Sequence, residues 1–224
     1  MSDYTIIERI IHRINKEVEP YFAPLRRKKL NNTDFTIISN NCWGGLCYEY
    51  FGLPKQSPTV GCYFFAEEYI RFITALPYYL NCNLTFIPTN KSRYYKELAQ
   101  RKQEDVLVGV LDDVEIVFLH YNDPIVAKAK WDRRVSRVNW NNLIIKFSYM
   151  NKCNDSLVDM FVQAVDNMHN QISDAKSIKS VLFVPKAFSQ YPYAIVLPNV
   201  KNGQIINDTF YWNKYCDIYS LINN

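Results

Sequence analysis

Glycine is scarce in this chain, with only six among 224 residues. Neither the GxGxxG nor the GxxxxGK[ST] pattern occurs, so the sequence predicts no glycine-rich phosphate loop of the common nucleotide-binding folds. The HExxH pattern of zinc hydrolases is also absent. These absences remove the commonest nucleotide-dependent and zinc-dependent enzyme classes from consideration.

Long apolar runs are missing as well. No stretch approaches the ~20 apolar residues that span a bilayer, and the first twenty residues lack the basic-then-apolar order of a signal peptide. Six cysteines occur without a CxxC pair and without histidines at zinc-ligand spacing. We therefore expect reduced thiols in a cytoplasmic protein, without a metal site.

Positive charge is in modest excess, with 26 basic against 22 acidic residues. The densest basic run, "LRRKKL" at 25–30, is too short for the basic stripe of a nucleic-acid-binding protein, so no nucleic-acid partner is predicted. This run is either a solvated loop or a patch that meets acidic lipid or an anionic substrate. The second alternative implies peripheral contact with the inner face of a membrane.

Predicted helices and strands alternate along most of the chain, as apolar spacing indicates. The predicted helices cover residues 3–17, 43–51, 66–79, 123–138, 154–169 and 211–222. The predicted strands cover residues 35–38, 84–87, 142–148, 180–184 and 193–197, with two more in 106–121 around Asp112-Asp113. This order predicts an α/β layered fold, with a mixed, mainly parallel sheet flanked by helices and one antiparallel hairpin.

Two parts are expected along the chain. Residues 1–30 form an amphipathic helix followed by the basic loop, and residues 31–224 form a single α/β domain. No internal repeat and no long polar linker divides the second part.

The stretch "IISNNCWGG", residues 37–45, places a thiol where a strand ends and a helix begins. Ligands bind beyond the carboxyl ends of strands in α/β sheets, and helix N-termini favour anions. Such a position lowers a thiol's pKa, so Cys42 is a candidate nucleophile with partial thiolate character. Asn40 and Asn41 are candidate donors to an oxyanion. A ligand-binding backbone or merely a tight corner would account for the same pattern.

The stretch "FLHYNDP", residues 118–124, places His120 at the end of an apolar strand. Its ordinary pKa suits general acid or base work, although a lone histidine in such a place is more often a structural residue. Asp123 either orients His120 or caps the helix that Pro124 begins. His12 and His169 are less suited to a site.

The stretch "KWDRRVSRVNW", residues 130–140, carries cations at helical spacing. Arg133 and Arg134 are candidates for clamping phosphate or carboxylate, and Trp131 for stacking on a sugar ring. A solvated, charged helix face with a packed tryptophan explains the pattern equally well. The Asp112-Asp113 pair is interpreted as turn chemistry.

Three motifs in this order resemble the DUF1919 family: "SNNCWGG", "SPTVG" at 57–61, and "HYNDPIVAKAKWDRRVSRVNW". The resemblance covers roughly residues 30–200, and the joint order of the motifs makes it specific. It implies a setting in bacterial exopolysaccharide or capsule biosynthesis, where some members are described as acetyltransferases. It places the site at these positions: Asn40, Asn41, Cys42, Trp43, Gly44, Gly45, Ser57, Pro58, Thr59, His120, Tyr121, Trp131 and Arg134. This chain departs from the family at "NDP", which favours a capping role for Asp123.

Three functions fit these observations. In the first, the protein transfers an acyl group from acetyl-coenzyme A or another acyl-coenzyme A to a hydroxyl of a saccharide or lipid-linked glycan. Cys42 or a bound thioester supplies the electrophile, His120 takes the hydroxyl proton, and Asn41 with the amides of Gly44 and Gly45 holds the oxyanion. Arg133, Arg134 or the basic loop would meet the coenzyme A phosphates.

The two alternatives belong to other classes. One is a non-catalytic glycan-binding or scaffold component of polysaccharide assembly, which docks through the N-terminal helix. The other is a nucleotide-sugar- or phosphate-donor transferase, in which Asp112-Asp113 would hold a divalent metal.

Overall fold

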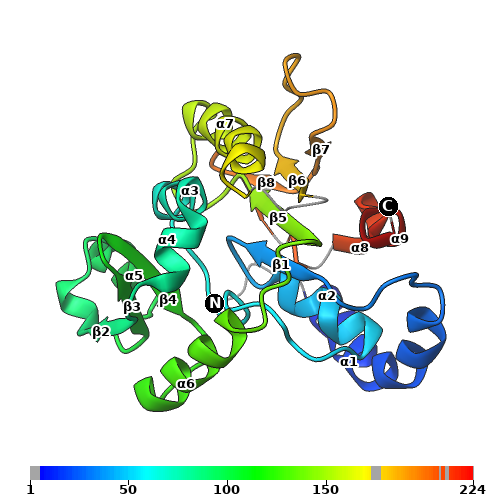
Figure 1. Cartoon of the computed structure of the whole chain (residues 1–224), viewed down its shortest axis with the longest axis horizontal. Helices are drawn as coiled ribbons and strands as arrows, with labels where there is room; N and C mark the ends of the chain where they lie inside the picture. The colour runs from blue at the N-terminus through cyan, green and yellow to red at the C-terminus, as the bar shows by residue number, and fades with distance from the viewer. Residues whose placement is uncertain (1–5, 173–177, 207, 210–211, 224) are drawn as a thin grey trace.

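The central sheet is parallel and has the strand order β1-β5-β6-β7 (Figure 1). A computed structural model describes residues 6–172, 178–206, 208–209 and 212–223. The strands of this sheet are β1 (Thr36–Ser39), β5 (Leu143–Ser148), β6 (Ile178–Val184) and β7 (Ile195–Val196). The register pairs Thr36 with Leu143, so β1 and β5 run side by side toward the same edge.

Both faces of this sheet are buried, as expected for parallel strands. Alternate residues of β5 point to opposite faces, so Leu143, Ile145 and Phe147 pack in one core and Ile144 in the other. The first core is covered by α3 (Ala66–Thr74) and α7 (Asp155–Gln171). The second is covered by α2 (Trp43–Phe51), α8 (Trp212–Tyr215) and α9 (Ile218–Asn223).

A second sheet, antiparallel and of strand order β2-β3-β4, lies beside α3 (Figure 1). Its strands are β2 (Thr85–Ile87), β3 (Leu107–Leu111) and β4 (Val114–Phe118). The chain around it forms α4 (Leu76–Asn81), the 3-10 turn η1 (Thr89–Lys91) and α5 (Tyr95–Gln100). We call β2, β3, β4 and these three short helices the hairpin lobe.

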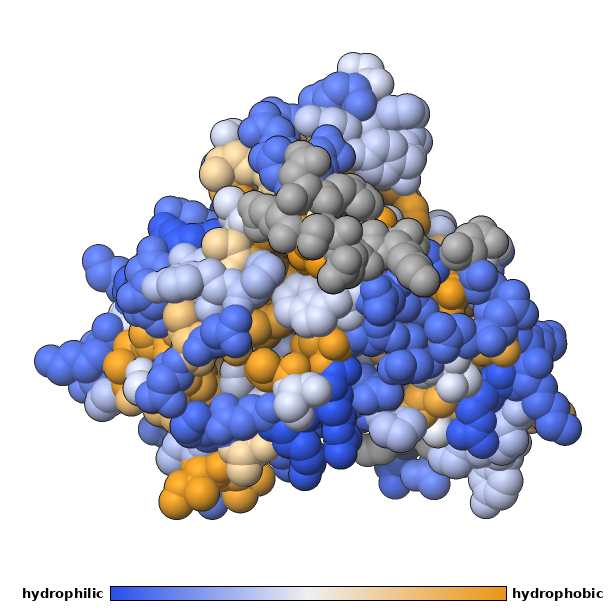
Figure 2. All heavy atoms as spheres, viewed as in Figure 1, coloured by the Kyte–Doolittle hydropathy of each residue, from blue (hydrophilic) through white to orange (hydrophobic). Residues whose placement is uncertain are grey.

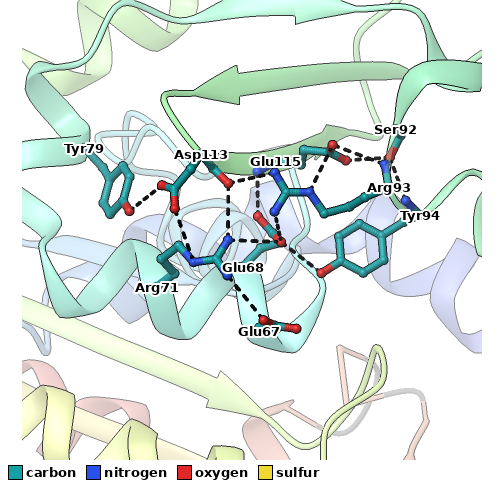
Figure 3. Close-up of polar contacts among 9 residues, drawn as sticks. All are labelled: Glu67, Glu68, Arg71, Tyr79, Ser92, Arg93, Tyr94, Asp113 and Glu115. Carbon is teal, nitrogen blue, oxygen red and sulfur yellow. Dashed lines mark hydrogen bonds and ion pairs between the residues drawn. The ribbon is translucent and has the colours of Figure 1, made fainter.

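A cluster of buried charge ties the hairpin lobe to α3 (Figure 3). Glu68 of α3 accepts hydrogen bonds from the Glu115 amide of β4 at 2.7 Å and from the Tyr94 hydroxyl at 2.9 Å. Arg93 bridges the two carboxylates, at 3.1 Å from Glu68 and 3.3 Å from Glu115. Ser92 donates a further hydrogen bond to Glu115. We call this set of five residues the lobe cluster, and its internal partners satisfy both buried carboxylates.

The remaining elements extend from these two sheets. They are α1 (Ile6–Arg27), α6 (Pro124–Val135), β8 (Val200–Lys201) and β9 (Gln204–Ile205). Helix α1 packs against α2 through Ala23, whose methyl group meets Gly52, and through Arg26, which lies 3.8 Å over the Tyr50 ring. In the described part of the chain, no helix is both long and apolar enough to cross a bilayer.

The predicted α/β class is confirmed, including the parallel sheet, the flanking helices and the antiparallel hairpin. The hairpin strands belong to a sheet of their own with β2, and do not extend the parallel sheet. The helix predicted over residues 66–79 ends at Thr74, because Pro77 lies in the first turn of a new helix, α4. Helix α1 runs ten residues beyond its predicted end at residue 17, and residues 3–5 and 211 of the predicted helices lie outside the described residues.

Candidate functional site

One short segment joins the two sheets and brings their ends together. The Phe64 amide donates to the Asn40 carbonyl at the end of β1 (3.0 Å), while Tyr63 exchanges two backbone hydrogen bonds with Val117 of β4. Two residues beyond the end of β4, the His120 amide donates to the Gly61 carbonyl at 3.1 Å. The three motifs singled out in the sequence therefore meet at one place.

Cys42 and His120 face each other at this junction. The Cys42 Sγ lies 3.4 Å from the His120 Nε2, which is hydrogen-bonding distance for sulfur. Cys42 is the N-cap residue of α2, but its thiol makes no capping hydrogen bond. When the imidazole carries its proton on Nδ1, the thiol can donate to Nε2. A nucleophile and a candidate base thus come from separate sheets, 78 residues apart in the chain.

Electrostatics keep this pair neutral at rest. Burial, followed by the negative charge of Asp208, raises the pKa of the Cys42 thiol to about 11. Burial, followed by the positive charge of Lys55, lowers the pKa of His120. The predicted thiolate is therefore corrected: desolvation outweighs the effect of the helix N-terminus. Proton transfer from Sγ to Nε2 must accompany any attack by this thiol.

A second buried cluster lies beside the thiol, at the carboxyl edge of the parallel sheet. Lys146 Nζ is 2.8 Å from the Asp208 carboxylate and 2.8 Å from the Asn41 side-chain oxygen. The same Asp208 oxygen accepts from the Ser148 hydroxyl (2.6 Å) and the Asn41 amide group (2.6 Å). We call Asn41, Lys146, Ser148 and Asp208 the site cluster. All four are buried.

The site cluster fixes the backbone on both sides of Cys42. The Asn41 side-chain oxygen also accepts from the Trp43 amide at 3.1 Å, so one side chain spans the residue between them. The Lys146 ammonium lies 5.3 Å from the centroid of the Phe183 ring, which adds cation–π stabilisation to its ion pair. Burial lowers the pKa of Lys146. Burial alone would raise the pKa of Asp208, but the charge of Lys146 and the hydrogen bonds that Asp208 accepts outweigh burial and lower it.

Sequence reasoning missed Lys146 and Asp208. Lys146 stands in "NLIIKFS", which was interpreted as an apolar strand, yet alternation places it on the α2 side of the sheet. A lysine inside such a strand was itself a signal, because a buried ammonium needs a partner. Asp208 carried no signal, since it follows a two-residue strand in an irregular segment.

Asn40, Ser57 and Thr59 hold the site together and do not face a ligand. The Asn40 side chain exchanges two 3.0 Å hydrogen bonds with the Ser148 backbone on β5. The hydroxyls of Ser57 and Thr59 are 3.0 Å apart, and that of Thr59 accepts from the Ser39 amide. The prediction that these side chains bind ligand is corrected, because the protein itself uses their polar groups.

The remaining residues of the first motif are also buried. Trp43 packs against Phe183 in the second core. A Cβ on Gly44 would lie 3.1 Å from Ile37, and one on Gly45 3.3 Å from Val60, so both glycines permit close packing of α2. The Asn41 side chain has both amide hydrogens engaged, with Asp208 and Met150. Only the backbone amides of Gly44 and Gly45, in the first turn of α2, remain as oxyanion candidates.

The third motif is mostly internal. The Arg134 guanidinium donates to the Tyr121 hydroxyl (2.6 Å) and the Val60 carbonyl (3.1 Å), and both side chains are buried. Trp131 packs between Phe72 and Phe118 in the first core. The predicted anion clamp by Arg134 and the predicted sugar contacts of Tyr121 and Trp131 are therefore corrected.

Arg133 and Arg137 are the exposed arginines of this motif, and the predicted anion contact of Arg133 stays a prediction. Lys55 is a half-buried cation; it forms an ion pair with Glu49 at 2.6 Å, and its charge acts on both Cys42 and His120. No pattern in the sequence singles out Lys55, because it lies in an irregular loop.

The other acidic candidates do not join the site. Asp123 accepts from the amides of Ile125 and Val126 and so caps α6. Asp112 and Asp113 accept from the hydroxyls of Tyr78 and Tyr79 at the hairpin turn. Within the described residues, no group of three or more His, Cys, Asp or Glu could hold a metal ion. The side chains of His12 and His169 lie outside the described ones.

Comparison with known proteins agrees with the motifs. The family described as "Domain of unknown function (DUF1919)" matches residues 13–223. The chain is also similar to an uncharacterised protein of Haemophilus influenzae, with 27% identity over 220 residues, which covers 96% of this chain and 95% of that protein. The match extends over nearly the whole chain, and the protein belongs to the DUF1919 family.

Proposed function

We propose that this protein is an acyltransferase that uses Cys42 as nucleophile and His120 as general base. The observation that carries the proposal is the 3.4 Å separation of Cys42 Sγ and His120 Nε2. A thiol paired with an imidazole is a recurrent arrangement for covalent acyl transfer. The amides at the start of α2 lie next to this thiol, where an oxyanion would form.

The reaction has two steps. The Cys42 thiol attacks the acyl carbonyl of a donor as His120 Nε2 takes the thiol proton. The donor's leaving group departs with that proton, and a thioester on Cys42 remains. An acceptor hydroxyl then attacks the thioester while His120 takes its proton, and the sulfur leaves and recovers the proton as the free thiol. The amides of Gly44 and Gly45 would hold the oxyanion in both steps.

The donor and acceptor classes are part of the same proposal. An acyl-coenzyme A fits as donor because the half-buried Lys55 and the exposed Arg133 could meet its phosphates. A saccharide or lipid-linked glycan hydroxyl is the acceptor that the resemblance to exopolysaccharide-associated proteins suggests. Neither class is needed for the thioester itself, so the nucleophile can be tested separately.

The first experiment traps the thioester. The full-length protein is incubated with acetyl-coenzyme A or with p-nitrophenyl acetate as a small activated donor, and the mass of the intact chain is measured. We expect one acetyl group on Cys42, absent in Cys42→Ala and retained in Cys82→Ala, since Cys82 is another partly exposed thiol. His120→Gln should slow acylation by about 100-fold or more, the usual loss when a general base is removed.

Two results would contradict the proposal. One is equal acetylation of Cys82 and Cys42, which would reflect ordinary thiol chemistry. The other is undiminished acylation in His120→Gln, which would remove the base from the mechanism.

A further inference from the structure

Helix α1 presents an apolar face to solvent. Its exposed apolar residues recur every three or four positions and so lie along one side of the helix. They are Ile10, Ile14, Val18, Tyr21, Phe22 and Leu25, with exposed fractions from 38% to 81%. Ala23 lies about 200° around the helix from Tyr21 and Leu25, and it packs on the protein where α2 ends. We call the six exposed residues the α1 stripe.

The net charge of the chain is concentrated on this helix and on the two lysines that follow it. Residues 6–29 contain seven Lys and Arg against three Glu, a net charge of +4, which equals the net charge of all 224 residues. The rest of the chain is therefore neutral overall. Arg13, Arg27, Lys28 and Lys29 are exposed along and just beyond the helix.

An apolar stripe with aromatic residues and flanking cations is typical of helices that lie in the interface of an anionic membrane. We propose that α1 docks the protein on an anionic lipid surface through the α1 stripe, with the basic residues beside it meeting the headgroups. A second copy of the chain is a poorer occupant, because two segments of net charge +4, residues 6–29 of each copy, would repel.

This docking is independent of the acyl-transfer proposal. Helix α1 contacts the C-terminal end of α2, whereas Cys42 stands at its N-terminal end, about 14 Å away along a nine-residue helix.

The test is flotation of the full-length protein with vesicles of phosphatidylcholine, with and without about 30% phosphatidylglycerol. We expect binding to the anionic vesicles, little binding to the neutral ones, and loss of binding in high salt. Ile14→Ser/Leu25→Ser should lower the partition coefficient about tenfold or more. Lys28→Gln/Lys29→Gln should lower it about tenfold on anionic vesicles.

Matched controls come from exposed residues elsewhere. Ile125 of α6 is 79% exposed, and Ile125→Ser should leave binding unchanged. Figure 2 shows an apolar patch over α6, so this control comes from another apolar surface of the molecule. Lys91→Gln/Lys96→Gln removes two exposed cations of the hairpin lobe and should also have no effect. Circular dichroism and the melting temperature check that each variant is folded.

Three results would overturn the proposal. They are no binding of the wild type to either vesicle, equal binding to neutral and anionic vesicles, and equal loss in the α6 control. Sedimentation as a dimer that Ile14→Ser/Leu25→Ser dissociates, without vesicle binding, would assign the stripe to a second copy.

Discussion

The site cluster and the lobe cluster both bury charge, but they do so differently. In the site cluster one lysine meets one aspartate, and both side chains are almost completely buried, at 0% and 2% exposure. In the lobe cluster Arg93 meets two carboxylates and remains 42% exposed. Water can still solvate the Arg93 guanidinium if its partners are lost, whereas it cannot reach Lys146.

The clusters also differ in what they hold. The lobe cluster joins α3 to the hairpin lobe. Its contacts run from Arg93, Tyr94 and Glu115 to the carboxylate of Glu68 on α3. The site cluster fixes Asn41 and the Trp43 amide, and the charges of Asp208 and Lys146 act on the Cys42 thiol. A buried ion pair is a weak source of stability. Its place beside Cys42 indicates that its role is to position that residue.

Removing one partner of the fully buried pair should have the largest effect. Lys146→Met leaves Asp208 without its cation, so we expect the free energy of unfolding to fall by about 3–5 kcal/mol in urea titration. The double variant Lys146→Met/Asp208→Leu removes both charges and should recover most of that loss. A single variant that costs less than about 1 kcal/mol would show that water reaches the site cluster after all.

The candidate site and the hairpin lobe each contain a glycine at which a side chain would clash with a neighbouring ring. A Cβ on Gly109 would lie 2.5 Å from the Phe118 ring, and one on Gly61 2.7 Å from the Tyr121 ring at a φ of +83°. We expect Gly109→Ala and Gly61→Ala each to cost about 2–3 kcal/mol by thermal or urea unfolding. Only Gly61→Ala should alter the rate of Cys42 alkylation, because the Gly61 carbonyl accepts a hydrogen bond from the backbone amide of His120. Equal changes in both variants would mean that the two regions are not separable.

A milder change in the lobe cluster should have a smaller effect. Glu68 accepts from the Tyr94 hydroxyl with one carboxylate oxygen and from the Glu115 amide with the other. Glu68→Gln replaces one of these oxygens with an NH₂ group that cannot accept, and should lower the free energy of unfolding by about 1–2 kcal/mol. Burial raises the pKa of Glu68 in the folded protein above the 4.5 of the unfolded chain. The stability that protonated Glu68 contributes is therefore complete below pH 4.5 and is lost as the pH rises through the pKa of the folded state. The stability difference between wild type and Glu68→Gln should therefore narrow from acid to neutral pH. A difference that widens toward neutral pH would contradict the raised pKa.

The smallest expected effect is on the thiol itself. The negative charge of Asp208 is among the causes that raise the pKa of Cys42 to about 11, so Asp208→Asn should lower that pKa. Because Asp208→Asn also leaves Lys146 unpaired and lowers the free energy of unfolding, the rate is measured well below the melting temperature of the variant. Alkylation of Cys42 at about pH 9, followed by mass spectrometry, should then be faster by a few-fold. Asp113→Asn and Glu68→Gln serve as controls and should leave the rate unchanged. An unchanged or slower rate in Asp208→Asn would remove Asp208 from the electrostatics of the site.

Local patterns in the sequence predicted local structure well. Helix α2 occupies the predicted residues, because the turn before it and the left-handed Gly52 after it define both ends. The Asp123 cap and Pro124 likewise mark the start of α6. The meeting of Cys42 with His120 was required by the transfer hypothesis, and the structure places them in contact.

Burial on helix α6 could not be predicted from spacing alone. The spacing of Trp131, Arg133 and Arg134 predicts a helix but does not say which side faces the core. Arg134 is buried because the Val60 carbonyl and Tyr121 offer it partners from another part of the chain. The partners of Lys146 are likewise remote in sequence, so only the assembled fold reveals them.

The contact between Asn41 and Asp208 also bears on how the chain is made. These residues are 167 positions apart, so Asn41 leaves the ribosome about 10–30 s before Asp208 does. Lys146 follows Asn41 but precedes Asp208 by 62 positions, so it is made about 3–12 s before its aspartate. The junction that brings Cys42 to His120 uses residues up to His120 and can form earlier, whereas the restraint that Asp208 places on Asn41 is added late in synthesis.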